Sequence, residues 1–213
     1  MKCKICNQNT QKFKNISLKK EYYHCINCEC IFLDELFFVS STKEKSQYDQ
    51  HNNSLENKGY VKMFEDFLDF FWEDIKDTTH LALDFGSGPG PVLETLIQKR
   101  DVSCDIYDKF YQPLKIYENK KYDLITSTEV FEHLKNPKET LDFFKNHLNK
   151  NGHIAIMTLF HNNDKEEFLN WWYPRDPTHI TFFTPKTFEV LASICGLKVV
   201  KTDKKRVILL SYM

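Results

Sequence analysis

Glu129, Glu132 and His133 form the densest group of chemically reactive side chains in this chain of 213 residues. Carboxylates and imidazoles serve enzymes as general bases, and both also bind divalent metals. On a helical turn, residues three and four positions apart share a face, so Glu129 would lie beside both of its neighbours in the motif. The pattern Glu-x-x-Glu-His therefore predicts half of a divalent-metal site or a group that removes a proton. In a purely structural alternative, the two glutamates cap the turn and His133 packs in the interior.

The segment 81–90, with the sequence LALDFGSGPG, predicts a cofactor-binding loop. Its apolar run is typical of a buried parallel strand, and Pro91 suits the first position of a following helix. Three glycines stand at alternate positions after the strand: Gly86, Gly88 and Gly90. Glycines allow positive φ angles and let backbone amides approach a ligand closely. Asp84, two residues before the first glycine, can hold a cationic amine or shape the loop around it.

The motifs that this loop lacks, and those that follow it, indicate the cofactor. A dinucleotide fingerprint would need a glycine where Pro91 stands, and the chain has no G-x-x-x-x-G-K-[ST] phosphate loop. The pattern D-x-G-x-G-x-G resembles the first motif of class I S-adenosylmethionine (SAM)-dependent methyltransferases. Residues 122–134, YDLITSTEVFEHL, are similar to the fourth-strand motif of that superfamily, where the chain leaves the sheet beside the donor sulfonium. The resemblance implies a Rossmann-like fold and SAM binding by Asp84, the three glycines and Thr128.

An acid after the second predicted strand, residues 102–107, is the candidate ribose ligand. Asp108 ends this strand, 18 residues past the last glycine of the loop. In doubly wound sheets an acid about 20 residues onward binds ribose hydroxyls. Asp105 falls in mid-strand and is the weaker candidate. Only 14 residues separate Asp108 from Asp123, so we predict a trimmed third-strand region and an adenine pocket walled by aromatic residues of the short link: Phe110 and Tyr111.

The resemblance also bears on the reaction. The chain has neither the Asn/Asp-Pro-Pro-Tyr/Phe motif of base and amide N-methylating enzymes nor the Pro-Cys of cytosine C5 methylation. The Glu-x-x-Glu-His block resembles the metal motif of polyprenyl-benzoquinol O-methyltransferases and of small-RNA 3′-terminal 2′-O-methyltransferases. In the latter a distant histidine completes the site, and residues 176–184, DPTHITFFT, look like the stretch that carries it. The resemblance thus implies that four residues converge on a divalent metal or a substrate hydroxyl: Glu129, Glu132, His133 and His179.

Four of the seven cysteines have the spacing of a zinc-binding module. They form two Cys-x2-Cys turns, with 18 residues between the turns: Cys3, Cys6, Cys25 and Cys28. A segment of about 40 residues buries too little apolar surface to fold alone, so a tetrahedral metal would stabilise it. Disulfides are disfavoured in a reducing compartment, and free thiols would not explain two matched turns. Cys30 or His24 could replace one of the four ligands.

Elements that position these groups follow from hydrophobic periodicity. The predicted elements are a helix over 59–77, the strand 81–85, a helix over 92–99, the strand 102–107, the strand of the 122–134 block, a helix over 138–148, a fifth strand over 153–159, a helix over 185–194 and a closing antiparallel hairpin. This order predicts an α/β, doubly wound, mostly parallel sheet in a class I methyltransferase domain of residues 59–213. A zinc ribbon of residues 1–40 and a polar linker of residues 41–58 precede it. With the two Cys turns and the stretch 48–52, YDQHN, the whole chain resembles a group of bacterial class I methyltransferases with an N-terminal zinc ribbon. That resemblance implies that Tyr48 and His51 fold over the cofactor.

Composition narrows the function further. The net charge is −1, so no global field favours nucleic acid or an anionic membrane. The N-terminus has no apolar signal region and no apolar run reaches the ~18 residues of a membrane span, which predicts a soluble cytoplasmic protein with no membrane partner. The favoured activity is SAM-dependent methylation of a hydroxyl on a small-molecule acceptor. Two alternatives stay open: a methyltransferase for RNA or another nucleic acid, guided by the ribbon, and a catalytically silent SAM-binding adaptor. The oligomeric state is not indicated.

Overall fold

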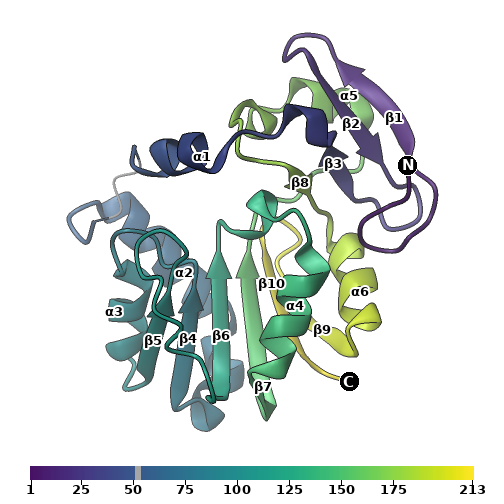
Figure 1. Cartoon of the computed structure of the whole chain (residues 1–213). Helices are drawn as coiled ribbons and strands as arrows, with labels where there is room; N and C mark the ends of the chain where they lie inside the picture. Colours follow the sequence, from purple (N-terminus) through teal and green to yellow (C-terminus); the bar gives the residue numbers. More distant parts are fainter. Residues whose placement is uncertain (51–53) are drawn as a thin grey trace.

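The computed structural model describes residues 1–50 and 54–213, which form two sheets (Figure 1). The larger sheet has the strand order β5-β4-β6-β7-β10-β9. Its strands are β4 (Leu81–Phe85), β5 (Ser103–Tyr107), β6 (Tyr122–Thr128), β7 (Leu148–Met157), β9 (Leu197–Thr202) and β10 (Val207–Tyr212). The first four in that order are parallel, whereas β10 runs antiparallel to both β7 and β9. The predicted mostly parallel sheet with a C-terminal antiparallel hairpin is confirmed.

Helices cover both faces of this sheet, as the doubly wound prediction requires. On one face α2 (Lys58–Ile75) and α3 (Val92–Gln98) pack against strand residues such as Ala82 and Leu124. On the other, α4 (Pro137–Asn146) and α6 (Pro185–Ile194) pack against Leu83 and Ile125. Successive strand side chains point to opposite faces, so each apolar strand supplies both cores. The helix α2 contributes a stripe at helical spacing: Phe64, Phe67, Leu68, Phe71 and Ile75.

The third-strand region is trimmed, also as predicted. Residues 108–121 are all described, and they hold turns and one isolated bridge, Asp108 with Gln112, but neither helix nor strand. Tyr117 from this segment packs on the face of the sheet that α4 covers. Its ring lies 5.0 Å from that of Tyr107 and 4.8 Å from that of Phe143 on α4. Aromatic packing therefore holds the segment after β5 against this face.

The N-terminal ribbon comprises β1 (Gln11–Asn15), β2 (Lys20–His24), β3 (Ile31–Leu33) and the two Cys-x2-Cys turns. Its sheet is completed by a strand from far along the chain, β8 (Thr181–Phe182), in the order β1-β2-β3-β8. Figure 1 shows the ribbon above α6 and beside the short helix α5 (Lys165–Asn170). The ribbon is thus joined to the C-terminal half of the chain by strand pairing.

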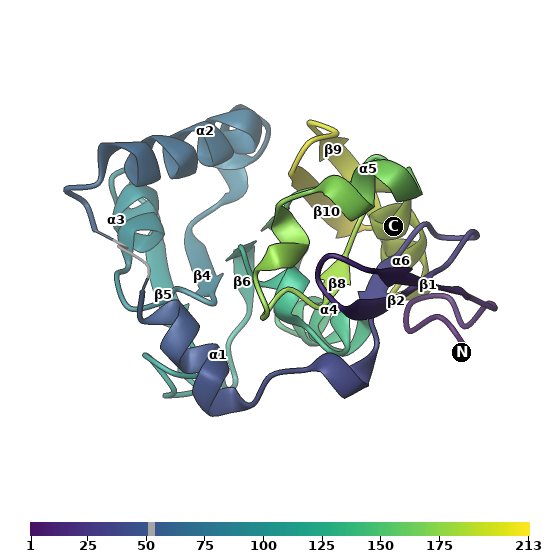
Figure 2. The ribbon, with the colours of Figure 1, turned by 90° about the horizontal axis from the view of Figure 1, so that it is seen from above.

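The segment predicted as a linker includes the helix α1 (Ser41–Tyr48), which begins at the N-cap Ser40. The helix was not predicted, because it buries none of its residues and so has no apolar stripe. Figure 2 shows α1 between the ribbon on one side and the β5–α3 region on the other. Of the two residues expected over the cofactor, Tyr48 ends α1, and His51 lies outside the described residues.

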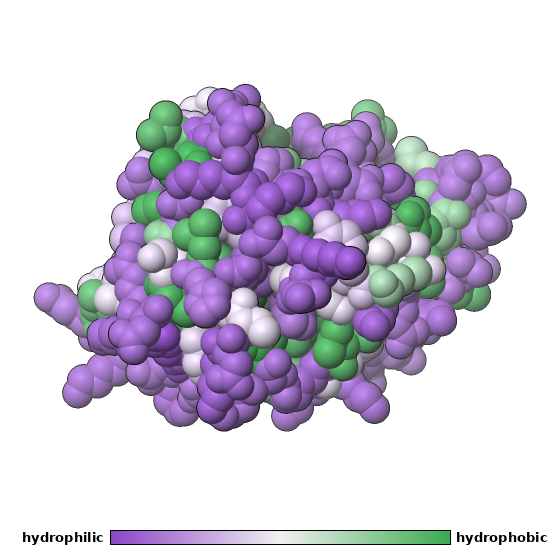
Figure 3. Space-filling view, turned by 90° about the horizontal axis from the view of Figure 1, so that it is seen from below, coloured by the Kyte–Doolittle hydropathy of each residue, from purple (hydrophilic) through white to green (hydrophobic). Residues whose placement is uncertain are grey.

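The two ends of the large sheet differ in character. At the amino ends of the strands, the face in Figure 3 is covered mainly by hydrophilic side chains, with apolar ones in small groups. The opposite ends carry the loops described below. Among residues 1–50 and 54–213, the helices lack the length and apolar character needed to cross a bilayer.

Candidate functional site

A cavity of about 460 Å³ opens at the carboxyl ends of the parallel strands. The loops that follow β4, β5 and β6 line it, together with Tyr48 of α1 and the segment that contains Trp172, Tyr173 and His179. The strand order reverses here, because β5 and β6 lie on opposite sides of β4. Ligands of open α/β sheets bind at such a switch point. Nearly all the residues predicted for the site therefore meet around one cavity.

The glycine loop lines the cavity with Gly86 and Gly88, and both have positive φ angles, of 89° and 66°. At Gly86 the requirement is steric as well: a Cβ would lie 2.2 Å from Cγ2 of Val130. The N–H of Gly88 donates to Oδ2 of Asp108 at 3.1 Å. Gly90, by contrast, neither lines the cavity nor has a positive φ. The expectation of a left-handed conformation is therefore confirmed at two of the three glycines and wrong at Gly90.

Two carboxyl groups shape the cofactor side of the cavity. Asp84 is almost fully buried in β4 and accepts a hydrogen bond from the hydroxyl of Thr126 at 3.0 Å. Burial raises the pKa of Asp84 to about 7. Asp108 accepts through Oδ1 from the amides of Phe110 and Tyr111, at 2.8 and 3.1 Å, and so holds the link after β5 against the glycine loop.

Of the other residues predicted for the cofactor side, three line the cavity and Asp105 does not. Thr128, Phe110 and Tyr111 line the cavity. Asp105, the weaker ribose candidate, lies outside the lining and bonds instead to Lys120 and Tyr122. The geometry thus favours Asp108 over Asp105 as the acid near a cofactor.

The Glu-x-x-Glu-His block has a different backbone from the one predicted. Glu129 has a φ of 53° and lies before the turn, which is a 3₁₀ helix over Phe131–His133. The N–H of Glu129 donates to the carbonyl of Met157 at 2.8 Å and so extends the pairing of β6 with β7. A residue that still pairs with the neighbouring strand cannot begin a helical turn. The prediction that Glu129 shares a helical face with Glu132 and His133 is therefore wrong.

The two glutamates still meet, through a tyrosine that the sequence analysis did not assign to the site. The hydroxyl of Tyr173 donates to Oε1 of Glu132 at 2.6 Å and lies 3.4 Å from Oε2 of Glu129. Burial, together with the neighbouring charge of Glu132, raises the pKa of Glu129 well above its usual range. Glu132 is fully buried, and its Oε2 has no hydrogen-bond partner among the described residues.

The two histidines lie side by side, with ring centres 4.8 Å apart. Nδ1 of His133 lies 3.0 Å from the carbonyl of Thr178, and Nδ1 of His179 lies 2.9 Å from the carbonyl of Tyr173. A carbonyl can only accept, so each Nδ1 carries the proton and each Nε2 keeps its lone pair. Burial lowers the pKa of both imidazoles to about 4, so both are neutral at physiological pH.

The side chains of Glu132, His133 and His179 therefore converge. One ligand atom each from Glu132, His133 and His179 lies within 4.8 Å of the others. Glu129 does not belong to this group, although its carboxyl lies in contact with the same tyrosine. The sequence signal that could have indicated Tyr173 is its position in an aromatic cluster six residues before His179.

A second cluster lies in the ribbon, where the Sγ atoms of the four predicted cysteines all lie within 4.8 Å of one another: Cys3, Cys6, Cys25 and Cys28. All seven cysteines carry free thiols. Each turn is followed by a residue in the left-handed region, Asn7 at φ 59° and Glu29 at φ 63°. Cys30 and His24 lie outside this group, and His24 bonds to Asn163 at 2.9 Å. The four cysteines therefore lie close enough together to hold one metal ion.

Comparison with known proteins assigns the chain to a family. The family described as "Methyltransferase domain" matches residues 55–202, more than half of the sequence. A search of curated proteins found no match. Among solved structures, the mitomycin 7-O-methyltransferase MmcR is similar, with a TM-score of 0.59 and 10% identity over 82% of this chain and 59% of its own. An O-methyltransferase family protein from Burkholderia thailandensis has a TM-score of 0.58 and 12% identity over 79% of this chain and 63% of its own.

A third similar structure is the plantazolicin methyltransferase BpumL in complex with SAH. It has a TM-score of 0.53 and 18% identity over 83% of this chain and 93% of its own. The chain spans only about three fifths of the length of the first two structures. Likeness at these identities shows the fold alone. The family match shows that this chain belongs to the methyltransferase-domain family.

Proposed function

We propose that the protein transfers the methyl group of SAM to a hydroxyl group of a small-molecule acceptor. The observation that carries this proposal is the convergence of two neutral imidazoles and a carboxylate oxygen of Glu132 on the cavity beside the glycine loop. The free lone pairs on Nε2 of the two imidazoles suit a substrate that has a proton to lose. A hydroxyl is such a group.

The residues on the cofactor side fit SAM. Gly86 and Gly88 leave backbone exposed to the cavity, and Asp108 is an acid at the end of β5 suited to ribose hydroxyls. A cationic amine beside Asp84 would return this buried carboxyl to its charged form. Thr128 would contact the cofactor from the end of β6, and Gly90 would support the loop from outside the lining. When bound, SAM supplies the electrophilic methyl group.

On the acceptor side, the enzyme holds the hydroxyl and removes its proton. His133 or His179 can take the proton on Nε2, because both are neutral and fixed in the Nδ1–H tautomer. Tyr173 holds Glu132 in place by donating its hydroxyl hydrogen to Oε1, and the same hydroxyl lies against the carboxyl of Glu129. Placement of the oxygen in line with the methyl group supplies much of the rate acceleration.

The side chains of Glu132, His133 and His179 are also suited to hold a divalent metal, and we propose that the site binds one in addition to SAM. Metal-binding histidines commonly donate their other N–H to a backbone carbonyl, as His133 and His179 do. A carboxylate oxygen of Glu132 would be the third ligand, with Glu129 beside it. A metal held there would lower the pKa of the acceptor hydroxyl.

In the ribbon, we propose a structural Zn²⁺ held by the four cysteines. Four thiolates without an open position are typical of structural zinc sites. The nucleic-acid alternative is disfavoured by the charges nearby. Lys12 pairs with Glu21 and Asp34, and Lys14 also pairs with Glu21, so these ribbon lysines are largely neutralised. A catalytically silent adaptor is disfavoured because it would not need Glu132, His133 and His179 to converge on the cavity.

Transfer of a labelled methyl group tests the proposed function. The zinc-loaded enzyme, SAM with a tritiated methyl group and Mn²⁺ would be incubated with bacterial extract separated into small-molecule, RNA and protein fractions. We expect label in the small-molecule fraction. The variant His179→Ala should lose about a hundredfold in rate, typical of a lost general base. His80→Ala, at an exposed site away from the cavity, is the matched control.

Each other outcome has a distinct meaning. Label in RNA or in protein would overturn the small-molecule assignment. Equal rates with and without Mn²⁺, or in Glu132→Gln and unmodified enzyme, would rule out the metal. No label in any fraction, with SAM still bound, would favour the adaptor.

A further inference from the structure

We infer that the metal-bound ribbon positions the side of the cavity formed by His179, Tyr173 and Glu132, which we call the acceptor wall. Loss of the ribbon metal would then disorganise these three residues and leave the SAM-binding side in place. The inference rests on the proposed function for the role of these three residues. Its structural basis is separate, because it concerns how the ribbon is joined to them.

The first connection runs through the backbone. In the paired strands β3 and β8, Ile31 lies opposite Phe182, and Phe32 lies opposite Thr181. The next residue of β3, Leu33, donates its N–H to the carbonyl of Ile180 at 2.9 Å. Ile180 in turn donates its own N–H to the carbonyl of Glu132 at 2.8 Å. A single residue, adjacent to His179, therefore links the ribbon to the backbone of Glu132.

The second connection runs through side chains. Lys4, between the first two cysteines, donates from Nζ to the hydroxyl of Thr181 at 3.1 Å. That hydroxyl donates to the carbonyl of Leu134 at 2.8 Å, one residue past His133. Nζ of Lys4 also lies over the ring of Phe32, 5.1 Å from the ring centre. The turn that carries two metal ligands is thus linked to the turn that carries the catalytic candidates.

The third connection is a shared apolar cluster. Its members come from the ribbon and from the acceptor wall: Tyr22, Ile31, Leu33, Phe168, Tyr173, Ile180 and Phe182. Tyr173 is the residue whose hydroxyl bonds to Glu132. The ring of Tyr173 packs against Phe182 of β8, with ring centres 6.2 Å apart, and β8 pairs with the ribbon strand β3, so the ribbon helps to position that hydroxyl.

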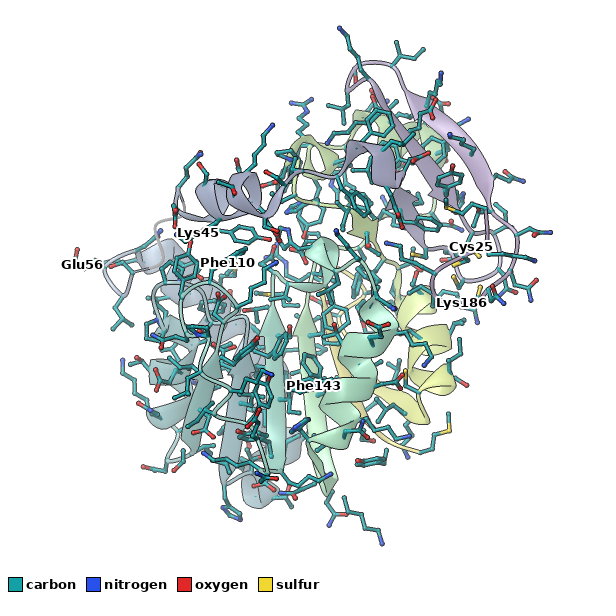
Figure 4. The ribbon with its side chains drawn as sticks, in the orientation of Figure 1. Cys25, Lys45, Glu56, Phe110, Phe143 and Lys186 are labelled. Atoms are coloured by element: carbon teal, nitrogen blue, oxygen red, sulfur yellow. The ribbon has the colours of Figure 1, made fainter. Side chains whose placement is uncertain are left out.

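The second Cys-x2-Cys turn, Cys25–Cys28, and the residue after it form hydrogen bonds with α6 and its N-cap. The hydroxyl of Thr187 donates to the carbonyl of Cys28, and that of Thr184 donates to the carboxylate of Glu29, each at 2.8 Å. Figure 4 shows Cys25 close to the start of α6, where Lys186 is labelled. The strand β3 has only three residues and follows the Cys25–Cys28 turn directly. A strand this short depends on the turn before it, and the turn depends on its metal.

The SAM side is joined to the ribbon less directly. Its residues follow β4, β5 and β6, which belong to the other sheet. The helices α2 and α3 pack on one face of these strands, and only the opposite face shares an apolar cluster with ribbon residues. Loss of the ribbon metal should therefore affect the two halves of the cavity unequally. This asymmetry is what an experiment can measure.

The test compares the full chain with and without zinc. Two-bond ¹H–¹⁵N spectra of the imidazoles report the tautomer of each histidine, and calorimetry reports binding of S-adenosylhomocysteine. In the zinc-loaded protein we expect the Nδ1–H tautomer at His133 and His179. After chelation we expect these two signals to lose that tautomer preference, with unchanged S-adenosylhomocysteine affinity, and to recover when one equivalent of zinc is restored. The same response is expected in Glu132→Gln, which weakens the proposed metal site beside the histidines, so that the response reports the metal of the ribbon.

A pair of variants tests the connection in the zinc-loaded protein. Lys4→Met removes the bond to Thr181, whereas Lys14→Met removes a lysine from the exposed side of the ribbon and is the control. We expect Lys4→Met alone to shift the His133 and His179 signals and to slow label transfer about tenfold, as a small misplacement of reacting groups would. Zinc content and S-adenosylhomocysteine affinity should be the same in both variants.

Two results would overturn the inference. One is an unchanged histidine spectrum in the zinc-free protein, which would make the ribbon an independent module. The other is loss of S-adenosylhomocysteine binding along with the histidine signals, which would make the metal a support for the whole fold. Failure of the proposed function would look different: no label transfer by the unmodified enzyme, with the histidine response to zinc intact.

Discussion

Asp84, the proposed partner of the SAM amine, is unfavourable for stability where its carboxyl must be charged. Folding buries its carboxyl and raises its pKa from an ordinary 3.8 to about 7. Between these two pH values the folded protein binds more protons than the unfolded chain. Its stability therefore falls as the pH rises through this window, and the full cost is present above pH 7.

The variant Asp84→Asn should remove this cost, because an amide keeps the shape and the bond from Thr126 without the charge. We expect its free energy of unfolding at pH 8 to exceed that of the unmodified protein by on the order of 2 kcal/mol, with the difference vanishing below about pH 4. Thermal unfolding without ligand across this pH range would measure it. Binding of S-adenosylhomocysteine should weaken in the same variant. A variant less stable than the unmodified protein at pH 8 would contradict the argument.

The sequence predicted which residues lie at the cavity where those residues belong to a local motif. The glycine loop, Asp84 and Asp108 follow from a strand, a turn and a fixed spacing. Tyr173 could not be found in this way, since its role depends on carboxylates more than 40 residues earlier in the chain. The conformation of Glu129 was also missed, because a strand partner at Met157 and not the local sequence determines it.

At the scale of elements, α1 is held over the cavity by a few polar contacts and by the ring of Tyr48. Glu44 accepts from Nζ of Lys109 at 2.8 Å, and Asp49 accepts from the hydroxyl of Tyr111 at 2.6 Å. The ring centre of Tyr48 lies 5.9 Å from that of Phe110. Figure 4 shows Lys45 on this helix, with Phe110 from the β5 loop nearby. These partners lie some 60 residues from α1 in the sequence, which is why periodicity could not predict the helix.

Polar surface contacts each contribute little free energy, so α1 should be easily displaced. We expect Glu44→Ala to increase the rate of S-adenosylhomocysteine release a few-fold, equivalent to about 1 kcal/mol or less, with little change in the melting temperature. Stopped-flow fluorescence would measure the release rate. Glu56→Ala, at an exposed position away from the cavity, is the control. Equal release rates in the two variants would show that α1 does not restrict release.

At the scale of the whole molecule, the charge is distributed unevenly although the net charge is only −1. The cavity lining includes five acids: Asp84, Asp108, Glu129, Glu132 and Asp176. Lys109 is the sole lysine or arginine among the described lining residues, and it pairs with Glu44. Such a lining is unfavourable for a phosphate-bearing acceptor.

We therefore expect weak binding of a fluorescein-labelled single-stranded RNA, with little change between about 50 and 200 mM salt. Fluorescence anisotropy would measure it, with the Lys14→Met variant as a check on the ribbon surface. Tight binding that falls steeply with salt, and is weakened in that variant, would instead support a nucleic-acid acceptor.

The pairing of β3 with β8 also has a consequence for how the chain is made. Residues 31–33 leave the ribosome long before residues 181–182, since 150 positions separate Ile31 from Thr181. Until then β3 has an open edge, and open edges invite pairing with other chains. Contacts this distant in sequence form slowly. Early metal capture by residues 3–28 would keep the nascent N-terminus compact during this interval, so zinc supply during translation should affect the yield of correctly folded protein.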